Sequence, residues 1–464
     1  MSHHSTPSVP SVTLISDTPL DATALYFVSY DGLVNNNSFQ KNGILTHRGH
    51  QYAAWYTADR SATVARRALP DGPWQRVALP HRLRYDDSHN VICLGVSPDD
   101  GRLHLLMDAH SDAFFSVTSE PGLTDAPQTR AWTAARFGDV QRTLGGATLT
   151  DQFTYPQFLI APDCALQLLY RSGVSGDGQA ALAEYADGRW TDLGAISAST
   201  GTYTTAHGTS TARSMYVHGC DYGPDGTLHV FFTWREQHAA VMRAPGGIAN
   251  HDLCYVTSPD HGRTWKDTEH TVAATGTGDL VSVADTGTIV VPLAPDHALM
   301  NQESQAVDSQ GRPHALWSYV PPRLAPYVTD YAADRAAHAR VFHTHRATDG
   351  RWHTTELPEP PRSTQRTRLV FDRHDHAYAV LPKGTIVAAS AASAWRDWRV
   401  VYDGTDLRAF GEVVVDELRL KEGEDGKEGK EGKEGTVLSV LYQQTSSGTT
   451  PSPIRVADFA LPDG

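Results

Sequence analysis

The sequence predicts an all-β fold, a seven-bladed β-propeller. A short pattern, a turn followed by an alternating strand, recurs seven times at a spacing typical of propeller blades. Asp-Gly and Pro-Asp-Gly turns separate the alternating apolar runs, which indicates hairpins. Helical periodicity is nearly absent apart from residues 330–339. Two hairpins per unit without a linker indicate one closed ring, and the alternative is a β-sandwich or a pair of β-domains.

Two marks locate the repeats along the chain. A turn ending in Trp follows most of the hairpins, and one of these turns, SPDHGRTW at Ser258–Trp265, matches the Asp-box. That box is a folding turn of many sialidase-like propellers and carries no chemistry. The seven hairpin turns lie at Gly49, Gly101, Cys164, Gly226, Gly311, Asp375 and Gly435, and the Trp turns end at Trp74, Trp190, Trp265, Trp352 and, more weakly, Trp132 and Trp398.

The two ends of the chain have separate interpretations. We expect residues 1–20 to be an N-terminal extension that closes the last blade, and residues 21–464 to form the single propeller. The charged, low-complexity run at 421–435 lies between two strand-like segments, GEVVVDELRL and TVLSVLYQQ. We therefore expect a disordered loop there, in place of the turn of the seventh hairpin.

Composition narrows the classes of partner. The 464 residues carry a net charge of −14, which argues against nucleic acids and anionic membranes as partners. No apolar run is long enough for a membrane helix. The N-terminus lacks the cationic start and apolar stretch of a secretory signal, so an intracellular protein is expected unless a leader was removed from a secreted form. The spacing of the four cysteines does not indicate disulfides. The protein is expected to be a monomer.

Hairpin register locates a candidate site. Residues that face each other in an antiparallel hairpin have numbers that sum to twice the turn position. Several polar residues then fall at the open ends of adjacent hairpins, where the first strand of each blade lines the propeller axis, so they should converge on the top of the funnel. The facing pairs are His89–His110, Tyr155–Arg171 and Tyr216–Arg235, and Gln302 and Glu303 begin the fifth hairpin at the same level.

Taken singly, each residue has a structural interpretation. His89 and His110 could cap turns, Tyr155 could be a core aromatic residue and Arg171 could form a salt bridge between blades. Arg235 with its neighbour Glu236 reads as a structural pair near the rim. Together, however, two imidazoles, a phenol and a guanidinium make a poor core and a plausible acid–base site for a carboxylate substrate.

Several segments carry a family resemblance: DSHNVICLGVSPDDGRLHL, FTYPQF, LLYRSGVSGDGQ, RSMYVHGCDY and MNQESQAVDSQGRPH. They resemble BNR-repeat β-propeller polysaccharide lyases, the ulvan lyases and the L-rhamnose-α-1,4-D-glucuronate lyases. The resemblance spans roughly residues 35–321. It implies a catalytic group of His89, His110, Tyr155 and Arg171, and a polysaccharide substrate containing uronate. Substrate-binding residues are expected at Asn90, Tyr216, Arg235 and Gln302.

Lyase chemistry explains these residue types. A lyase removes the C5 proton of glucuronate and expels the C4 oxygen, which leaves a 4,5-unsaturated uronate. A guanidinium at Arg171 would stabilise the charge that develops on the carboxylate. The C5 proton and C4 oxygen of glucuronate can lie on one side, so one group can act first as base and then as acid. Tyr155, if a cation lowers its pKa, and His89 both remain candidates for the base.

Two further hypotheses concern metal and mechanism. His218, Cys220, His251 and Cys254 could hold a structural divalent metal, zinc or calcium, whereas no organic cofactor is expected. The alternatives to a lyase are a sialidase-like hydrolase, suggested by the Asp-box, and a carbohydrate-binding propeller without catalysis. The first lacks a clear Tyr–Glu pair, and the second would place equivalent pockets in every blade.

Overall fold

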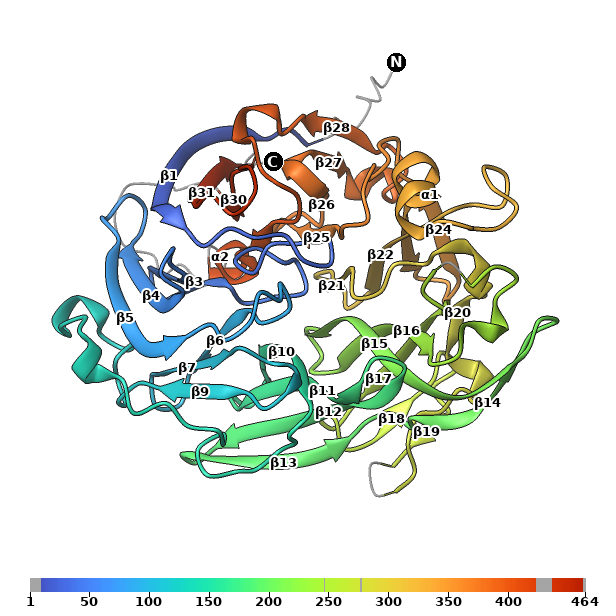
Figure 1. The fold of residues 1–464 in the computed structure, drawn as a ribbon, viewed down its shortest axis with the longest axis horizontal. Coiled ribbons are helices and arrows are strands. Elements are labelled where there is room, and N and C mark those ends of the chain that lie inside the picture. The colour runs from blue at the N-terminus through green and yellow to red at the C-terminus, as the bar shows by residue number, and fades with distance from the viewer. Residues whose placement is uncertain (1–9, 246, 276–277, 423–435, 462–464) are drawn as a thin grey trace, which may run out of the picture.

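The structure, a computed structural model, describes residues 10–245, 247–275, 278–422 and 436–461. The strands within these ranges form antiparallel sheets arranged around a common centre, and the first strand of most sheets lies nearest to it (Figure 1). The predicted all-β propeller is therefore confirmed.

In chain order, the first sheets contain β2 (Ile44–His47), β3 (His50–Tyr56), β4 (Ser61–Ala68) and β5 (Gln75–Arg82); β6 (Ile92–Ser97), β7 (Arg102–Met107) and β9 (Phe115–Thr118); and β8 (His110–Asp112), β10 (Phe153–Ile160), β11 (Leu166–Val174), β12 (Asp177–Ala186) and β13 (Arg189–Ala195). The largest sheet contains β14 (Thr200–Thr204), β15 (Thr209–Tyr222), β16 (Leu228–Glu236), β17 (Asn250–Ser258), β18 (Trp265–Lys266), β19 (Val272–Ala274) and β20 (Ile289–Val291).

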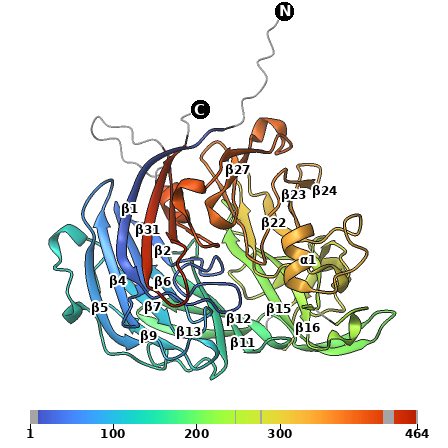
Figure 2. The same ribbon diagram turned by 45° about the horizontal axis from the view of Figure 1, so that its top comes forward.

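The remaining sheets contain β21 (Ser304–Val307), β22 (Pro313–Tyr319), β23 (Arg340–Arg346) and β24 (Trp352–Glu356); β25 (Arg368–Phe371), β26 (Ala377–Val380), β27 (Ile386–Ala389) and β28 (Arg399–Tyr402); and β29 (Val414–Val415), β30 (Val437–Gln443), β31 (Ser452–Ala460) and β1 (Thr13–Ala24). Since β1 pairs with β31, the first and last strands of the chain lie side by side and close the ring (Figure 2).

The seven predicted hairpins are all present as strand pairs. They are β2–β3, β6–β7, β10–β11, β15–β16, β21–β22, β25–β26 and β29–β30. The Asp-box is the turn between β17 and β18, where Asp260 accepts hydrogen bonds from the Thr264 backbone and hydroxyl. It acts as the folding turn that the sequence indicated.

The prediction of seven complete blades is wrong. Within the described residues, six sheets contain four or more strands, and the remaining sheet, of β6, β7 and β9, contains three. That sheet is incomplete because the next short strand, β8, leaves it and pairs with β10 of the neighbouring sheet. The weak Trp turn at Trp132 lies in this region, outside any strand. Counting hairpins therefore overestimated the number of complete blades.

In the described part of the chain, two α-helices and several short 3-10 helices interrupt the strands. The helical stretch predicted at 330–339 is α1 (Tyr331–His338), and the Asp330 side chain caps it by accepting a hydrogen bond from the Ala333 backbone. The segment GEVVVDELRL was expected to be a strand, but only Val414–Val415 pairs, and α2 (Glu417–Glu422) follows. Residues 421 and 422 of the expected loop belong to α2, and residues 423–435 lie outside the described residues.

The core lies between neighbouring sheets, so most strands are buried on both faces. This arrangement explains why β3, HQYAAWY, is an almost continuous buried run, whereas β5 alternates between buried and exposed residues. Trp55, Trp265, Trp317 and Trp395 are among the largest side chains that these interfaces enclose. In the described part of the chain, no helix is long and apolar enough to cross a membrane.

Candidate active site

His89 and His110 face each other, as the hairpin register predicted. His89 lies just before β6 and His110 begins β8, and their rings stack with centroids 4.1 Å apart and planes 12° from parallel. Asp87 holds both rings: its two carboxylate oxygens lie 3.0 Å from Nδ1 of His89 and 2.6 Å from Nδ1 of His110. Asp87 was not predicted from the sequence, although a carboxylate two residues before His89 was the available signal.

This arrangement determines the ionisation of Asp87 and of His89. Burial opposes ionisation of Asp87, but hydrogen bonds from His110 and His89 outweigh it and lower the pKa of Asp87. Burial also lowers the pKa of His89 to about 4, despite the nearby carboxylate. His89 is therefore neutral near pH 7. Because its Nδ1–H donates to Asp87, its Nε2 carries the lone pair that can accept a proton.

Tyr155 and Arg171 are in contact, but not as the directly facing pair that was predicted. Arg171 pairs with Thr154, and a bulge between Thr154 and Gln157 places Tyr155 in the left-handed region, at φ 60°. Pro156 lies in the same bulge, where its missing N–H costs no ladder hydrogen bond. The Arg171 guanidinium carbon lies 5.0 Å from the centre of the Tyr155 ring.

Tyr216 and Arg235 show the same kind of departure. Their predicted pairing is wrong, because Tyr216 pairs with Thr233 and Arg235 with Ser214, and a register shift lies between Val217 and Gly219. The two side chains still meet, with the Arg235 guanidinium carbon 4.6 Å from the centre of the Tyr216 ring. The expected pair of Arg235 with Glu236 is also wrong, since Glu236 binds Arg213 at 2.8 Å.

Arg171 is a buried cation held by neutral groups. Only 3% of the residue is exposed. Its guanidinium donates hydrogen bonds to Tyr216 Oη at 2.8 Å, Ser111 Oγ at 2.7 Å and Thr154 Oγ1 at 2.9 Å. Within the described ranges it forms no ion pair, and its Nε is buried without a hydrogen-bond partner. A buried charge of this kind favours an anionic ligand, and a carboxylate matches the geometry of the guanidinium.

The two tyrosines differ in their tendency to ionise. Burial and the neighbouring Tyr216 raise the pKa of Tyr155, although Arg171 acts in the opposite direction. Burial also opposes ionisation of Tyr216, but Arg235 and Arg171 outweigh it, so the pKa of Tyr216 lies below its usual value. The lowered pKa expected for Tyr155 therefore belongs to Tyr216, and Tyr155 remains a neutral hydroxyl that can donate a proton.

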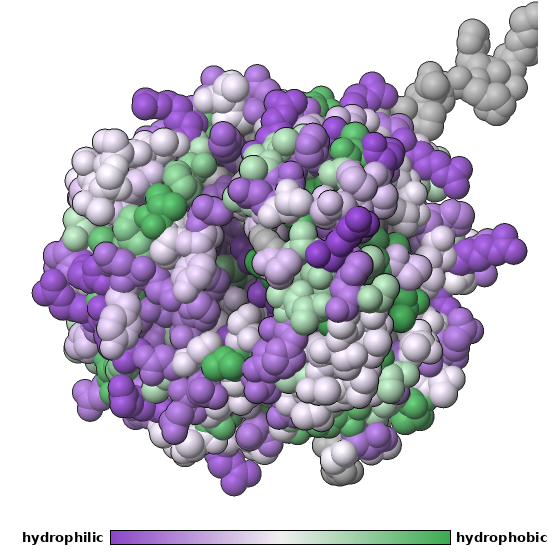
Figure 3. All heavy atoms as spheres, turned by 45° about the vertical axis from the view of Figure 1, so that its right-hand side comes forward, coloured by the Kyte–Doolittle hydropathy of each residue, from purple (hydrophilic) through white to green (hydrophobic). Residues whose placement is uncertain are grey.

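The other predicted residues lie around this group. Tyr155, Arg171, Tyr216 and Gln302 line one small cavity, so three adjacent hairpins do converge there. Asn90 is buried beside His89, and its backbone N–H donates to the Asp87 carbonyl. Figure 3 shows a hollow near the middle of one face of the molecule, with hydrophilic residues along much of its border.

Two further residues were missed. Tyr30 is 71% exposed, and its ring lies edge-on to His89 and His110, at centroid distances of 4.7 and 5.7 Å. An exposed aromatic ring at such a site suits stacking against a sugar. Arg366 also lies beside the group: its guanidinium carbon is 5.3 Å from the centre of the Phe39 ring, which stacks on His89, and it forms an ion pair with Glu412 at 3.1 Å. Nothing in the sequence around either residue distinguishes it.

Larger cavities lie at the other end of the sheets, near the hairpin turns and α2. Asp221 and Lys421 line two of these cavities. Carboxylates line both of these cavities, and Lys41 beside them already forms ion pairs with Asp221 at 2.5 Å and with Glu417 at 3.5 Å. Arg171, by contrast, is held by neutral groups, which makes its end of the sheets the better candidate for an anionic substrate.

The structure does not bring His218, Cys220, His251 and Cys254, the predicted metal ligands, together as one group. The first two residues lie on β15 and the others on β17, and β16 separates these strands. His218 Nδ1 accepts a hydrogen bond from the Glu303 backbone, while both ring nitrogens of His251 bind carboxylates. Among the described residues, two other groups bring possible ligand atoms within 4.8 Å of one another: Asp87 with His89 and His110, and His314 with His343 and His345.

Sequence comparison places the chain in a family. A profile described as "BNR repeat-containing family member" matches residues 50–359, which are 310 of the 464 residues. The chain belongs to the BNR repeat-containing family. The match includes the hairpin turns at Gly101, Cys164, Gly226 and Gly311, and it contains the whole of the group from Asp87 to Arg235.

Curated relatives of this BNR repeat-containing protein are ulvan lyases. The chain is 26% identical over 181 residues to an ulvan lyase, long isoform, of Alteromonas sp., and 25% identical over 181 residues to one of Pseudoalteromonas sp. (strain PLSV). Each alignment covers 31% of this chain and 18% of the relative, so the chain matches less than a fifth of their length.

Solved structures share the fold. The polysaccharide lyase Uly1 superposes with a TM-score of 0.71 at 16% identity, covering 96% of this chain and 99% of that one. A PL25 ulvan lyase bound to -[GlcA(1-4)Rha3S]- superposes with a TM-score of 0.61 at 13% identity, covering 95% and 94% of the two chains. The BNR repeat-containing protein therefore has the propeller architecture of these enzymes.

Proposed function

We propose that the protein is a polysaccharide lyase that cleaves the α-L-rhamnosyl-(1→4)-D-glucuronate linkage by β-elimination. The observation that carries the proposal is the buried guanidinium of Arg171, held by neutral groups beside the Asp87-linked histidine pair. The relatives named ulvan lyase, and the similar structure bound to a glucuronate–rhamnose repeat, support the same choice of substrate.

Arg171 would bind the carboxylate of glucuronate. As the C5 proton leaves, charge moves onto the carboxylate oxygens, and a guanidinium already fixed by Tyr216, Ser111 and Thr154 stabilises that charge without reorganising. The negative charge of the whole molecule would repel such a substrate, so a local cation is required.

His89 is the better candidate for the base. It is neutral near pH 7, and its free Nε2 can take the C5 proton, while Asp87 stabilises the imidazolium that results. Tyr155 keeps its proton and is the better candidate for the acid that protonates the departing C4 oxygen. Their ring centroids lie 5.8 Å apart, so both groups can reach one side of a glucuronate.

The products of a rhamnose–glucuronate glycan test the reaction class. A lyase generates the near-UV absorbance of a 4,5-unsaturated uronate together with new reducing ends. The sialidase-like hydrolase alternative would release reducing ends without that absorbance, and a carbohydrate-binding propeller would retain the glycan without cutting it. Either of these results would refute the proposed elimination.

Two variants separate the proposed base from the proposed acid. His89→Ala should abolish turnover of the natural glycan. Tyr155→Phe should also abolish it, yet it should still cleave a glucuronate whose C4 leaving group is a good one, because such a group needs no proton. A matched control is His261→Gln in the Asp-box, whose ring lies beside Asp163 and Tyr222 and not in this group, so the variant should keep full activity. An active His89→Ala chain would show that the histidine is not the base.

A further inference from the structure

A cluster of three histidines lies in a different sheet from the candidate active site. His314 is on β22, and His343 and His345 are on β23. His314 pairs directly with His345, and His343 precedes it by two residues, so strand periodicity places all three imidazoles on one face of the sheet. That face packs against the next sheet, where Phe371 and Trp395 lie 4.6 and 4.5 Å from His314, measured between ring centroids.

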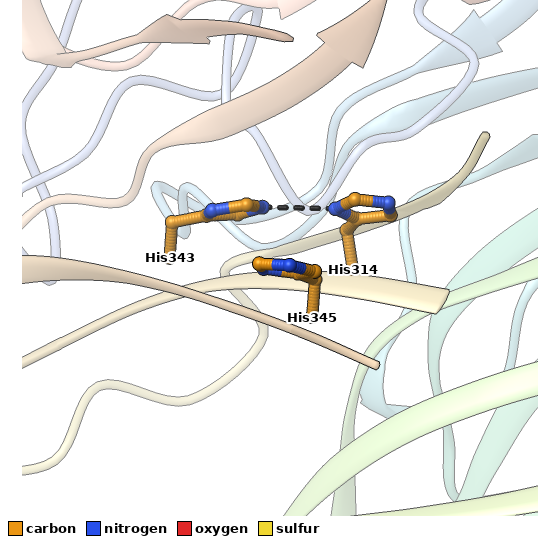
Figure 4. A group of neighbouring side chains, drawn as sticks. All are labelled: His314, His343 and His345. Carbon is orange, nitrogen blue, oxygen red and sulfur yellow. Dashed lines mark hydrogen bonds between the residues drawn. The ribbon is translucent and has the colours of Figure 1, made fainter. Parts of the chain in front are cut away.

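The cluster is buried and its hydrogen bonding is incomplete. His314 and His343 are 0% exposed and His345 is 4% exposed. Figure 4 shows His343 and His314 facing each other, with a hydrogen bond of 2.9 Å between His343 Nε2 and His314 Nδ1, while His345 lies beside both. Nδ1 of His343 and Nδ1 of His345 are buried without a partner. A buried polar atom without a partner destabilises a fold, so the unpartnered Nδ1 of His345 in this apolar interface points to a ligand.

The residues around His314, His343 and His345 favour binding of a metal cation by the three imidazoles. The three rings are enclosed by indole rings: Trp395 lies 4.5 Å from His314 and 4.9 Å from His345, and Trp398 lies 5.3 Å from His343, measured between ring centroids. Nε2 of His314 lies 3.3 Å from a carboxylate oxygen of Asp308, which fixes the tautomer that leaves Nδ1 unprotonated. A carboxylate behind a histidine is the usual support for a metal ligand.

We propose that His314, His343 and His345 form a structural zinc site between the sheet of β21–β24 and the sheet of β25–β28. Ligand nitrogens of the three residues lie within 4.8 Å of one another. Zinc would replace the hydrogen bond between His314 and His343, and the proton on His343 Nε2 would move to the unpartnered Nδ1 of the same ring. No net proton is released. Neutral imidazoles select zinc and similar transition-metal ions over calcium and magnesium, which prefer oxygen ligands.

Metal content tests the site directly. The full-length protein is stripped with a chelator, incubated with Zn²⁺ and desalted, and we expect about one zinc ion per chain and a higher midpoint of thermal unfolding. Ca²⁺ and Mg²⁺ should have neither effect. His345→Gln should lose the zinc and the thermal shift. Wild-type protein that retains no zinc, or a His345→Gln chain that retains as much as the wild type, would overturn the proposal.

Two control variants test whether the zinc belongs to this cluster. His104→Gln removes a buried histidine that packs against Trp190 and Tyr185 in another interface, so it matches the packing loss and should keep the zinc. His89→Ala removes the second possible metal group and should also keep it. The visible spectrum of the Co²⁺-loaded His89→Ala chain decides the question even if His345→Gln does not fold. Intense absorption of four-coordinate Co²⁺, held by the three imidazoles and one water molecule, supports the site, and the weak spectrum of a six-coordinate ion overturns it.

Discussion

Among single residues, Arg171 is the one that most clearly requires an anionic ligand, because its side chain is buried and its hydrogen-bond partners are hydroxyl groups. We predict that Arg171→Lys loses roughly a hundredfold in kcat/KM, equivalent to about 3 kcal/mol of transition-state stabilisation. Lysine keeps the charge, but its ammonium has three donors and cannot bind Tyr216, Ser111, Thr154 and a carboxylate at once. The rate of absorbance increase on a rhamnose–glucuronate glycan measures the loss, and circular dichroism checks the fold. Turnover near that of the wild type would remove Arg171 from the mechanism.

The pH profile identifies the base. If neutral His89 removes the proton, kcat/KM falls as pH drops through about 4, the pKa that burial imposes on His89, and is flat from there to neutral pH. The same depressed pKa means that the unfolded chain binds the proton more tightly, so protein stability also falls between about pH 6.5 and 4. Profiles are therefore recorded where circular dichroism is unchanged. A rise of kcat/KM only on the alkaline side would assign the base to Tyr216 instead.

For the site residues, the sequence predicted which side chains meet, but it did not predict the strand register at the two tyrosines or which tyrosine ionises more readily. The His89–His110 contact followed from register alone, because no bulge lies between that pair and the turn. Tyr155 and Tyr216 both lie on strands with a shift in register, which depends on how the strands pack and is not encoded in the spacing. The pKa values of the two tyrosines depend on burial and on Arg235, so only the structure could reverse their roles.

Among the elements, α2 connects the end of the ring to its beginning. Asp416, directly before α2, accepts hydrogen bonds from the Arg419 backbone at 3.1 Å, from the Thr46 backbone and hydroxyl on β2 at 2.9 and 2.6 Å, and from Gln51 on β3 at 2.8 Å. One buried carboxylate thus caps the helix and ties it to the first sheet. The strand predicted for this segment ends at Val415, and the helix cap is recognisable only when β2 and β3 are in place.

We predict that Asp416→Ala lowers the free energy of unfolding by about 2–4 kcal/mol, because a helix cap and several buried donors lose their acceptor together. Urea denaturation followed by circular dichroism measures the change. Asp403→Ala is the matched control, since Asp403 accepts hydrogen bonds from Thr405 in an exposed turn and should have a much smaller effect. Equal effects of the two variants would mean that Asp416 does not hold α2 in place.

For the whole molecule, closure of the ring depends on β1. Its pairing with β31 extends from Thr13 with Ala460 to Ala24 with Ser452, and Asp21 accepts a hydrogen bond from the buried Trp55 indole of β3 at 2.8 Å. Strand β1 therefore contacts both the last sheet and the first one. The propeller and its hairpin turns could be predicted from the repeats, whereas the unequal sizes of the sheets could not, because they depend on which neighbour a short strand such as β8 joins.

We predict that a chain lacking residues 1–24 is destabilised by more than about 4 kcal/mol, beyond the effect of a usual single substitution. It should also self-associate, since β31 would become an unpaired edge strand. Thermal unfolding and light scattering measure the two effects. A chain that begins at residue 11 keeps β1 and serves as the control. If both truncated chains behave like the full-length protein, β1 does not contribute to closure.

Because β1 pairs with β31, the two ends of the chain lie next to each other, and the sheets could keep the same order around the centre if the chain began at another position. A short linker could join the two ends near Thr13 and Ala460, and new ends could be opened in the exposed turn at Asp349–Gly350 between β23 and β24. Such a circular permutant would keep every sheet and the group from Asp87 to Arg235 intact. The same geometry offers a practical position for fusing a second protein, since an insertion in that turn leaves the closing strand pair untouched.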